Sequence, residues 1–207
     1  MKKLVLIAAA VAIGHTGFSQ ISIDPEIGMN ISNNRLKISG NDAESFDSKI
    51  GISAGVGVTL GLTKNVYLRP GIYYQDLGSK TEGFGTASTI NYHYLRVPVN
   101  IGYNYKISNS AGSVFVEAGP YVGYALAGQS KTEVLGIETK TDIEFGDGIA
   151  ESKAFDWGFN FGLGYESPWG VYVKGGYGLG LGNLSNIDDV KLSHRHFNIA
   201  LGYKIKL

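Results

Sequence analysis

Cysteine is absent from this chain of 207 residues, which excludes a disulfide framework and a lipid-modified N-terminal cysteine. An excess of one charge is missing too. Lys2 and Lys3 fall in a predicted leader, and without these two of the 18 basic residues, 16 basic residues face 18 acidic ones, a formal charge of −2. This balance gives no electrostatic reason to expect nucleic acid. Beyond residue 20 no apolar run reaches the length of a membrane-spanning helix, so an exported chain of this kind is either soluble or a β-barrel.

The first residues have the features of a secretory signal peptide. Lys2 and Lys3 form a basic start, residues 4–14 form an apolar stretch, and Gly17 and Ser19 are the small residues expected before a cleavage site. The apolar stretch is too short to span a membrane. We therefore predict a signal peptide at residues 1–19, removed before Gln20, and one barrel domain at residues 20–207.

Residues 155–183 show the strongest pattern in the chain. Odd positions are mostly large and apolar, beginning with Phe155 and Trp157, whereas even positions are mostly polar residues or glycine. Strict alternation over more than ten residues predicts extended strands with two different faces. Residues 167–170 join two such strands into a long hairpin. The 30 glycines and only 5 prolines of the chain also favour strands and turns over disorder.

The size of the side chains indicates which face is inside. The interior of an eight-stranded barrel holds only modest side chains, so the large apolar residues of all strands would not fit there. If these residues face lipid, the glycines leave room for a few polar side chains across a narrow lumen. This apolar-out, polar-in pattern is typical of transmembrane β-barrels. The alternative that keeps the apolar face inside is a soluble, lipocalin-like barrel with an apolar cavity.

Similar alternating segments cover the rest of the chain, and short and long connections follow them in turn. This asymmetry predicts an all-β fold, an eight-stranded antiparallel up-and-down transmembrane β-barrel of the outer membrane, with both termini beside the short turns in the periplasm. The predicted strands are residues 21–32, 50–62, 66–75, 92–106, 113–126, 155–166, 171–183 and 194–207, and the predicted long loops are residues 33–48, 76–89, 127–153 and 184–193.

Three prolines fall inside the predicted strands. Pro70, Pro98 and Pro120 each lack a backbone donor, and a closed barrel has no edge where this loss is harmless. We therefore expect a β-bulge or a strand end at some of these positions.

Short motifs spread in order over the mature chain resemble those of one known family. They are Gly28-Met29-Asn30, Leu68-Arg69-Pro70-Gly71-Ile72-Tyr73-Tyr74 with Gly78, Tyr94-Leu95-Arg96-Val97-Pro98-Val99, Glu117-Ala118-Gly119-Pro120-Tyr121-Val122-Gly123-Tyr124 and Tyr177-Gly178-Leu179-Gly180-Leu181-Gly182-Asn183. With these motifs the chain resembles the Bacteroidetes outer-membrane β-barrel domain proteins, often called PorT-like. The resemblance implies an eight-stranded outer-membrane barrel and a role near protein secretion or envelope assembly. The motifs build the barrel and transfer no residue-level role.

Charged residues on the inward face predict an ion-pair network. Buried charge is costly unless it is paired, so five acidic and five basic side chains in a space shielded from lipid should form pairs. We expect a structural plug, with a narrow selective pore as the functional alternative. The core of the network is predicted as Glu26, Arg69, Arg96, Glu117, Asp156 and Lys174, with Asp24, Glu166, Lys204 and Lys206 as further members.

The longest connection, residues 127–153, is the predicted partner-contacting surface, because loops on rigid scaffolds carry function. Alternation in residues 132–144 suggests that the strands continue beyond the membrane as a hairpin. We expect outer-membrane lipid as one partner, a second envelope protein as another, no nucleic acid, and a monomeric barrel. The candidate contact residues are Lys131, Glu133, Glu138, Asp142, Glu144 and Asp147.

Chemical sites are weakly indicated. His194 and His196 share a strand face at the predicted mouth, but two ligands make a poor metal site, and Asp188-Asp189 lacks the spacing of a calcium loop. The glycine run at residues 176–182 has period two on a strand and no following helix, unlike a phosphate loop.

A lipid-modifying enzyme is the alternative function. It would use Ser193 with His194, or Thr89 with His93, as nucleophile and base, and the sequence shows no third member for either pair. We predict no catalysis, no metal and no cofactor.

Overall fold

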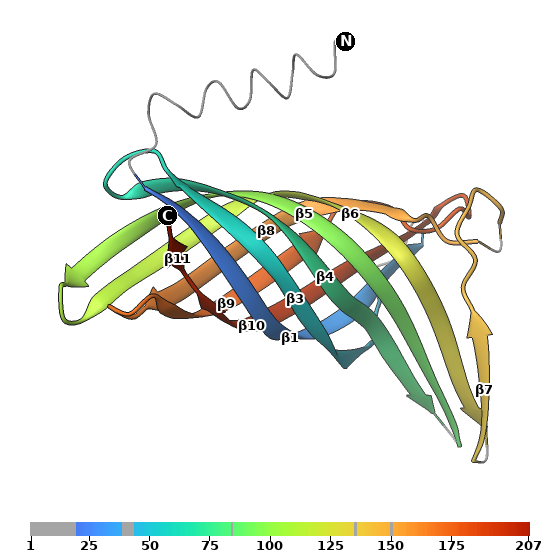
Figure 1. Ribbon diagram of the computed structural model, residues 1–207. Coiled ribbons are helices and arrows are strands. Elements are labelled where there is room, and N and C mark those ends of the chain that lie inside the picture. The colour runs from blue at the N-terminus through green and yellow to red at the C-terminus, as the bar shows by residue number, and fades with distance from the viewer. Residues whose placement is uncertain (1–19, 39–43, 84, 135, 150) are drawn as a thin grey trace, which may run out of the picture.

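The computed structural model describes residues 20–38, 44–83, 85–134, 136–149 and 151–207; the predicted signal peptide lies outside this part of the chain. Within it, eight long antiparallel strands form one closed barrel, in which each strand pairs with its sequence neighbours and β10 pairs back to β1 (Figure 1). The barrel strands are β1 (Ile21–Ile38), β3 (Asp47–Gly61), β4 (Val66–Gly83), β5 (Thr86–Ser108), β6 (Gly112–Val134), β8 (Phe155–Glu166), β9 (Val171–Gly180) and β10 (Val190–Tyr203).

Three short strands accompany the barrel: β2 (Glu44–Ser45) and β11 (Ile205–Lys206) pair with β1, and β7 (Ile137–Asp142) pairs with β6. The predicted fold class is confirmed. The described residues include no helix that is both long enough and apolar enough to cross a membrane.

The alternation in the sequence sets the two faces of the barrel wall. Outward positions hold exposed apolar side chains such as Ile27, 65% exposed, and Phe155, 55% exposed. Inward positions hold polar residues such as Asp24 and Asp156, both fully buried. An apolar exterior around a polar interior is the arrangement of a barrel whose solvent is lipid.

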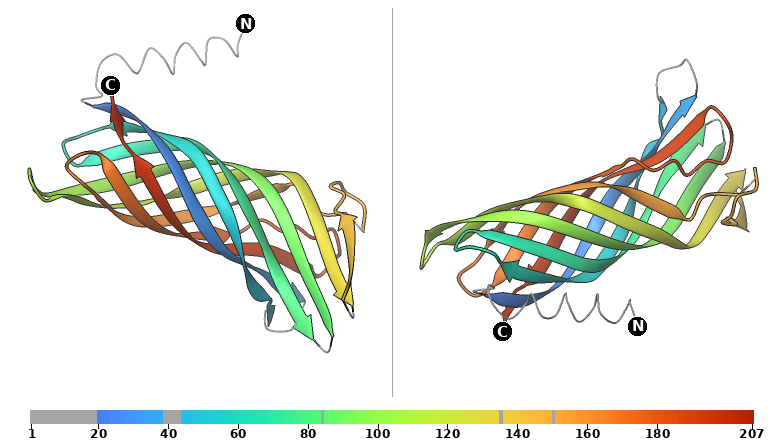
Figure 2. Two further views of the ribbon diagram at one scale, coloured as in Figure 1. Left: turned by 60° about the horizontal axis from the view of Figure 1, so that its bottom comes forward. Right: turned by 90° about the horizontal axis from the view of Figure 1, so that it is seen from above.

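The short connections and both ends of the described chain lie together at one end of the barrel. Residues 62–65, 109–111 and 167–170 connect neighbouring strands there, close to the start of β1 and to β11. At the opposite end the strands run on past the barrel wall (Figure 2). We call these the turn end and the loop end. The predicted asymmetry of the connections is therefore present, although the loop end is built differently from the prediction.

Several predicted loops are wrong, because the strands are longer than the apolar alternation. β1 continues to Ile38, and β4 and β5 continue as a hairpin to Gly83 and Thr86, where a loop over residues 76–89 was expected. β10 begins at Val190, four residues before the predicted start. The expected hairpin within residues 127–153 does form, from β6 and β7. In these extensions most side chains on both faces are polar and the apolar ones are scattered, so the regular alternation that predicted the strands is absent.

The expectation for the prolines is also wrong. Pro70, Pro98 and Pro120 lie inside strands in continuous register, opposite Val99, Tyr121 and Phe159 respectively. Register shifts occur elsewhere, for example between His93 and Tyr94 on β5. Each missing donor interrupts the ladder locally, and the pairing resumes beyond it without an inserted residue. The flanking pairs are numerous enough to hold the strands in register.

Candidate functional site

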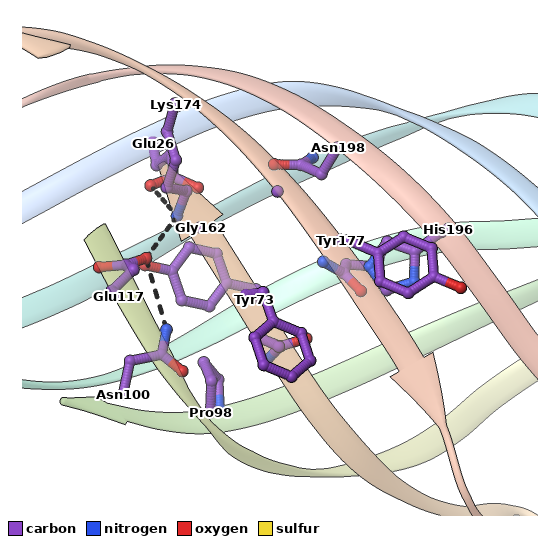
Figure 3. Close-up of a pocket in the computed structure, with 14 residues that line it drawn as sticks. Glu26, Tyr73, Pro98, Asn100, Glu117, Gly162, Lys174, Tyr177, His196 and Asn198 are labelled. Atoms are coloured by element: carbon purple, nitrogen blue, oxygen red, sulfur yellow. Dashed lines mark hydrogen bonds and ion pairs between the residues drawn. The ribbon is translucent and has the colours of Figure 1, made fainter. Parts of the chain in front are cut away.

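A cluster of charged side chains fills the middle of the lumen, around the guanidinium group of Arg69 on β4. Arg69 Nε lies 3.3 Å from Asp24 Oδ2, its Nη2 lies 3.2 Å from Glu26 Oε2, and its Nη1 lies 3.4 Å from Glu117 Oε2. Lys174 on β9 bridges the same two glutamates, with its Nζ 2.9 Å from Glu26 Oε2 and 3.3 Å from Glu117 Oε1 (Figure 3). We call these five residues the central cluster.

The central cluster joins strands that are farthest apart around the barrel. In the closed ring, β4 lies opposite β9 and β1 lies opposite β6. Arg69 and Lys174 therefore reach from β4 and β9 to the carboxylates of Glu26 on β1 and Glu117 on β6. All five side chains are at most 11% exposed. The cluster is a set of cross-braces through the lumen, and no strand pairing could provide it.

Tyrosine and asparagine side chains complete the hydrogen bonding of the cluster. Tyr67 donates to Glu117 Oε2 at 3.2 Å, Tyr172 donates to Glu26 Oε2 at 3.0 Å, and Asn100 donates to Glu117 Oε1 at 3.4 Å. Two inward glycines make space for the rings: a Cβ at Gly102 would overlap the ring of Tyr67, and one at Gly202 would overlap that of Tyr172. The glycines of the inward face therefore have a packing role.

A second ion pair lies nearer the loop end. Arg96 Nη2 donates to Asp156 Oδ2 at 2.7 Å, and the hydroxyl of Tyr121 donates to the same oxygen at 3.0 Å. The guanidinium carbon of Arg96 lies 4.1 Å from the ring centroid of Tyr121 and 5.4 Å from that of Tyr94, within cation–π range. Both charged groups are at most 2% exposed, so the pair is shielded from solvent.

An apolar cap lies above this pair. Leu77, Tyr92, Tyr94 and Ala125 form a buried cluster, and Phe145 from the connection after β7 packs against it. Three carbonyls of that connection, those of Gly146, Gly148 and Glu151, accept hydrogen bonds from the amide of Asn186. The connection is thus tied to the segment between β9 and β10. From the loop end inward, the cap, the Arg96–Asp156 pair and the central cluster fill successive levels of the lumen.

A pocket remains in the lumen beside the central cluster, on the side of the Arg96–Asp156 pair. It contains about 490 Å³ of space free of protein atoms, part of it open to solvent, and is lined by Glu26, Tyr73, Asn100, Glu117, Lys174 and His196 among others. Asn100 Oδ1 and His196 Nδ1 are buried there with no hydrogen-bond partner in the protein. Buried polar atoms of this kind are usually satisfied by water.

The predicted network residues are brought together in two groups. Glu26, Arg69, Glu117 and Lys174 meet in the central cluster, together with Asp24, whereas Arg96 and Asp156 form a separate pair. Of the outer members, Glu166 and Lys204 pair at the turn end with Nζ and Oε2 2.6 Å apart. Lys206 was expected in the lumen and is instead exposed: it keeps the register opposite the inward Ser22, but it lies at the end of β11, on the rim of the barrel.

Sequence reasoning missed the ion pair between Lys49 and Asp76, whose Nζ and Oδ1 are 2.6 Å apart. Both residues lie in segments that were predicted as loop or loop boundary. It also missed the lumen hydrogen bonds of Tyr67 and Tyr172. An inward tyrosine opposite an inward glycine is the signal that could have indicated them.

The histidines expected at the rim are buried in the lumen, so that expectation is wrong. His194 is fully buried and both ring nitrogens are engaged, Nδ1 2.6 Å from Asn34 Oδ1 and Nε2 3.1 Å from the hydroxyl of Tyr94. His196 is 4% exposed and packs against Gly178. Among the described residues, no three potential metal ligands lie close together.

The two catalytic pairs considered from the sequence are not assembled as such. With both ring nitrogens engaged, His194 has none free to take a proton from Ser193. His93 bonds through Nδ1 to the hydroxyl of Tyr74 at 2.7 Å, and its ring stacks on that of Tyr74. Thr89 lies four residues away on the same strand, opposite Lys131. Neither pair places a hydroxyl beside a free histidine nitrogen.

The candidate contact residues lie on the exposed loop end. Lys131 and Glu133 belong to β6, Glu138 and Asp142 belong to β7, and Glu144 and Asp147 follow β7. Lys140 donates a hydrogen bond to Glu138 and lowers the pKa of that carboxyl. These side chains project into solvent from the β6–β7 hairpin and the connection after it, apart from Lys131, which is half-buried.

Comparison with known proteins identifies the family. A family model described as "Outer membrane protein beta-barrel domain" matches residues 16–186. The chain belongs to this family of outer-membrane barrels. No curated protein matches it.

Several solved structures are similar to this outer-membrane barrel. The outer membrane protein OprG from Pseudomonas aeruginosa is 13% identical, with 91% of this chain and 97% of that chain covered and a TM-score of 0.48. Neisserial surface protein A (NspA) is 14% identical, with coverages of 88% and 97% and a TM-score of 0.42. Ail, the attachment invasion locus protein of Yersinia pestis, is 14% identical, with coverages of 91% and 100% and a TM-score of 0.34.

Proposed function

We propose that this outer-membrane barrel is a closed, non-catalytic envelope protein that acts through its loop end, of structural, adhesion or envelope-complex type. The central cluster carries this proposal, because Arg69 and Lys174 brace the lumen between opposite strands. Moving the side chain of Arg69 or Lys174 out of the lumen would leave buried carboxylates without a partner, which is strongly unfavourable. The apolar cap above Arg96 and Asp156 adds a second closure. The exposed loop-end surface is then the part left to meet a partner.

The finer placement of the protein rests on its sequence motifs and its asymmetry. We propose that it is a PorT-like protein of Bacteroidetes type that assists secretion or envelope assembly, with both termini in the periplasm. The termini lie at the turn end, which faces the periplasm in outer-membrane barrels. An epitope tag at Gly136, in the β6–β7 turn, should then be accessible on intact cells, and a tag after Leu207 should not. Labelling of the C-terminal tag on intact cells would show that the barrel has the opposite orientation.

Conductance measurements in a planar bilayer test the closed lumen. We expect no steady conductance from the native barrel, and measurable openings from Lys174→Ala, which removes one brace. Steady conductance of the native barrel would contradict closure. It would instead favour the second candidate, a narrow pore, which the polar pocket with unpartnered Asn100 and His196 atoms supports.

A further inference from the structure

The loop end finishes in a sheet whose last strand, β7, has an unpaired outer edge. Residues 79–83 of β4, 86–91 of β5, 129–134 of β6 and all of β7 pair in that order, and we call them the loop-end sheet. Among the described residues β7 pairs only with β6, so its other side is open. All six side chains of β7 are exposed. β7 lies at the end of the molecule opposite the C-terminus and the start of β1 in each view (Figures 1 and 2).

Charges along the loop-end sheet are arranged in rows of one sign. Lys131 on β6 lies directly opposite Lys140 on β7, and Glu133 lies directly opposite Glu138. Across β5 the rows continue to Lys80 and Glu82 on β4. Like charges that face each other across strands destabilise a sheet. Within β7 the two rows are joined by one ion pair, with Lys140 Nζ 2.9 Å from Glu138 Oε1. Opposite charge placed beyond the free edge would relieve both rows further.

Backbone geometry limits what can pair with β7. Ile143 donates its N–H to the carbonyl of Gly128 at 2.9 Å, in the same register as the pairs of β7 with β6. In an antiparallel ladder, successive residues turn their backbone groups to alternate sides. Thr139 and Thr141 thus bond toward β6, whereas Glu138, Lys140 and Asp142 present their backbone groups to the open edge.

We infer that the occupant of this edge is a second copy of the same chain, paired antiparallel with Thr139 facing Thr139. In this register Glu138 faces Lys140 of the second copy and Lys140 faces its Glu138. Two of the three residues with free backbone groups therefore form hydrogen-bonded pairs of opposite charge. The lysine row of each copy runs into the glutamate row of the other. Moving the register by two residues places Lys140 against Lys140, or Glu138 against Glu138.

The symmetry of this contact places the two barrels on opposite sides of the paired β7 strands. Two antiparallel strands are related by a two-fold axis perpendicular to their sheet, so the second barrel lies on the far side of the seam. Because β7 lies at the end opposite the C-terminus and the start of β1, the contact joins two molecules head to head, as in two facing membranes. This inference deepens the proposed function, whose loop-end surface it uses. It replaces the expectation of a monomer.

Clustering of proteoliposomes tests the charge pairing. Vesicles carrying the native barrel with the loop end outside, verified by cleavage of a protease site at Gly136, should cluster. Lys140→Glu sets Glu138 against a glutamate at both ends of the seam and should abolish clustering. The double exchange Glu138→Lys with Lys140→Glu restores opposite pairs and should recover it. Unchanged clustering by Lys140→Glu, or no recovery by the double exchange, would overturn the inference, while the proposed barrel orientation and closure would stand.

Cysteine crosslinking tests the register without changing charge, because the chain has no cysteine of its own. Thr139→Cys should form a disulfide-linked dimer under mild oxidation, since non-hydrogen-bonded partners have Cα atoms about 4.5 Å apart, within disulfide range. Thr141→Cys is the matched control. Its copies would be four residues apart along the strands, roughly 13 Å, and should not crosslink. Equal crosslinking of both variants, or of neither, would contradict the register.

Discussion

The barrel wall and the loop-end sheet are built from the same strands but differ in what surrounds them. β6 shows this within one element: its outward residues Val116 and Val122 are exposed and apolar, whereas Lys131 and Glu133, further along the same face, are charged. In the wall, stability comes from inward ion pairs and an outward lipid face. In the extension, most side chains are polar and exposed, and strand pairing with a few exposed side-chain contacts maintains the structure. Substitutions should therefore act very differently in the two regions.

The largest effect is expected for Arg69→Met in the central cluster. The change leaves Asp24 and Glu26 with one cation fewer in a buried site, and breaking such a site by removing one partner costs about 3–5 kcal/mol. The free energy of unfolding in lipid vesicles, measured by urea titration, checks this. Lys131→Met in the loop-end sheet is the matched control and should change stability little. Equal effects of the two substitutions would remove the distinction between the regions.

An arginine introduced on an exposed position should destabilise the wall, which faces lipid, and not the loop-end sheet, which faces water. Ile27→Arg places a cation against lipid and should cost about 2–4 kcal/mol if the position lies near the bilayer midplane. Ile137→Arg, on exposed β7, should cost almost nothing. The same urea titration measures both. A tolerated arginine at residue 27 would mean that this face is not in lipid.

A smaller effect is expected where a glycine makes room for a ring. Gly102→Ala places a methyl group against the ring of Tyr67, and overpacking of this kind costs about 1–3 kcal/mol. Gly83→Ala is the control, because its added Cβ meets no atom within 4 Å. If Tyr67→Phe reduces the cost at residue 102 only slightly, the ring itself and not its hydroxyl is the obstacle. A neutral Gly102→Ala would contradict the close packing.

The smallest effect on the barrel is expected from shortening the β6–β7 hairpin. Replacing residues 129–142 by a short turn removes exposed strand and leaves Phe145 and the cap in place. Heat-modifiability on gels and the midpoint of urea unfolding should stay as in the native protein. A barrel that fails to fold would show that the loop-end sheet is needed for the wall, and the two regions would not be independent.

A region could be predicted where its two strand faces differ clearly in hydrophobicity, and could not where they are alike. Residues 155–166 alternate large apolar groups with glycine and acid, so both the strand and its orientation could be predicted. Residues 76–89 carry mostly polar side chains on both faces, with Leu77 as an isolated apolar one, and this pattern does not separate a loop from the paired ends of β4 and β5. The members of the charge network could be predicted because inward charge must pair. The division into two groups could not, because it depends on the relative heights of Arg69 and Arg96 in a tilted barrel.

Site-directed spin labelling along β6 tests the central claim most directly, because this strand crosses from the wall into the loop-end sheet. Labels at outward positions Val116 and Val122 should be accessible to oxygen dissolved in lipid and shielded from a water-soluble nickel reagent. Labels at Lys131 and Glu133, on the same face beyond the wall, should show the reverse. Strong accessibility of Val116 and Val122 to the water-soluble reagent would contradict the account, because the apolar face would then not be in the membrane.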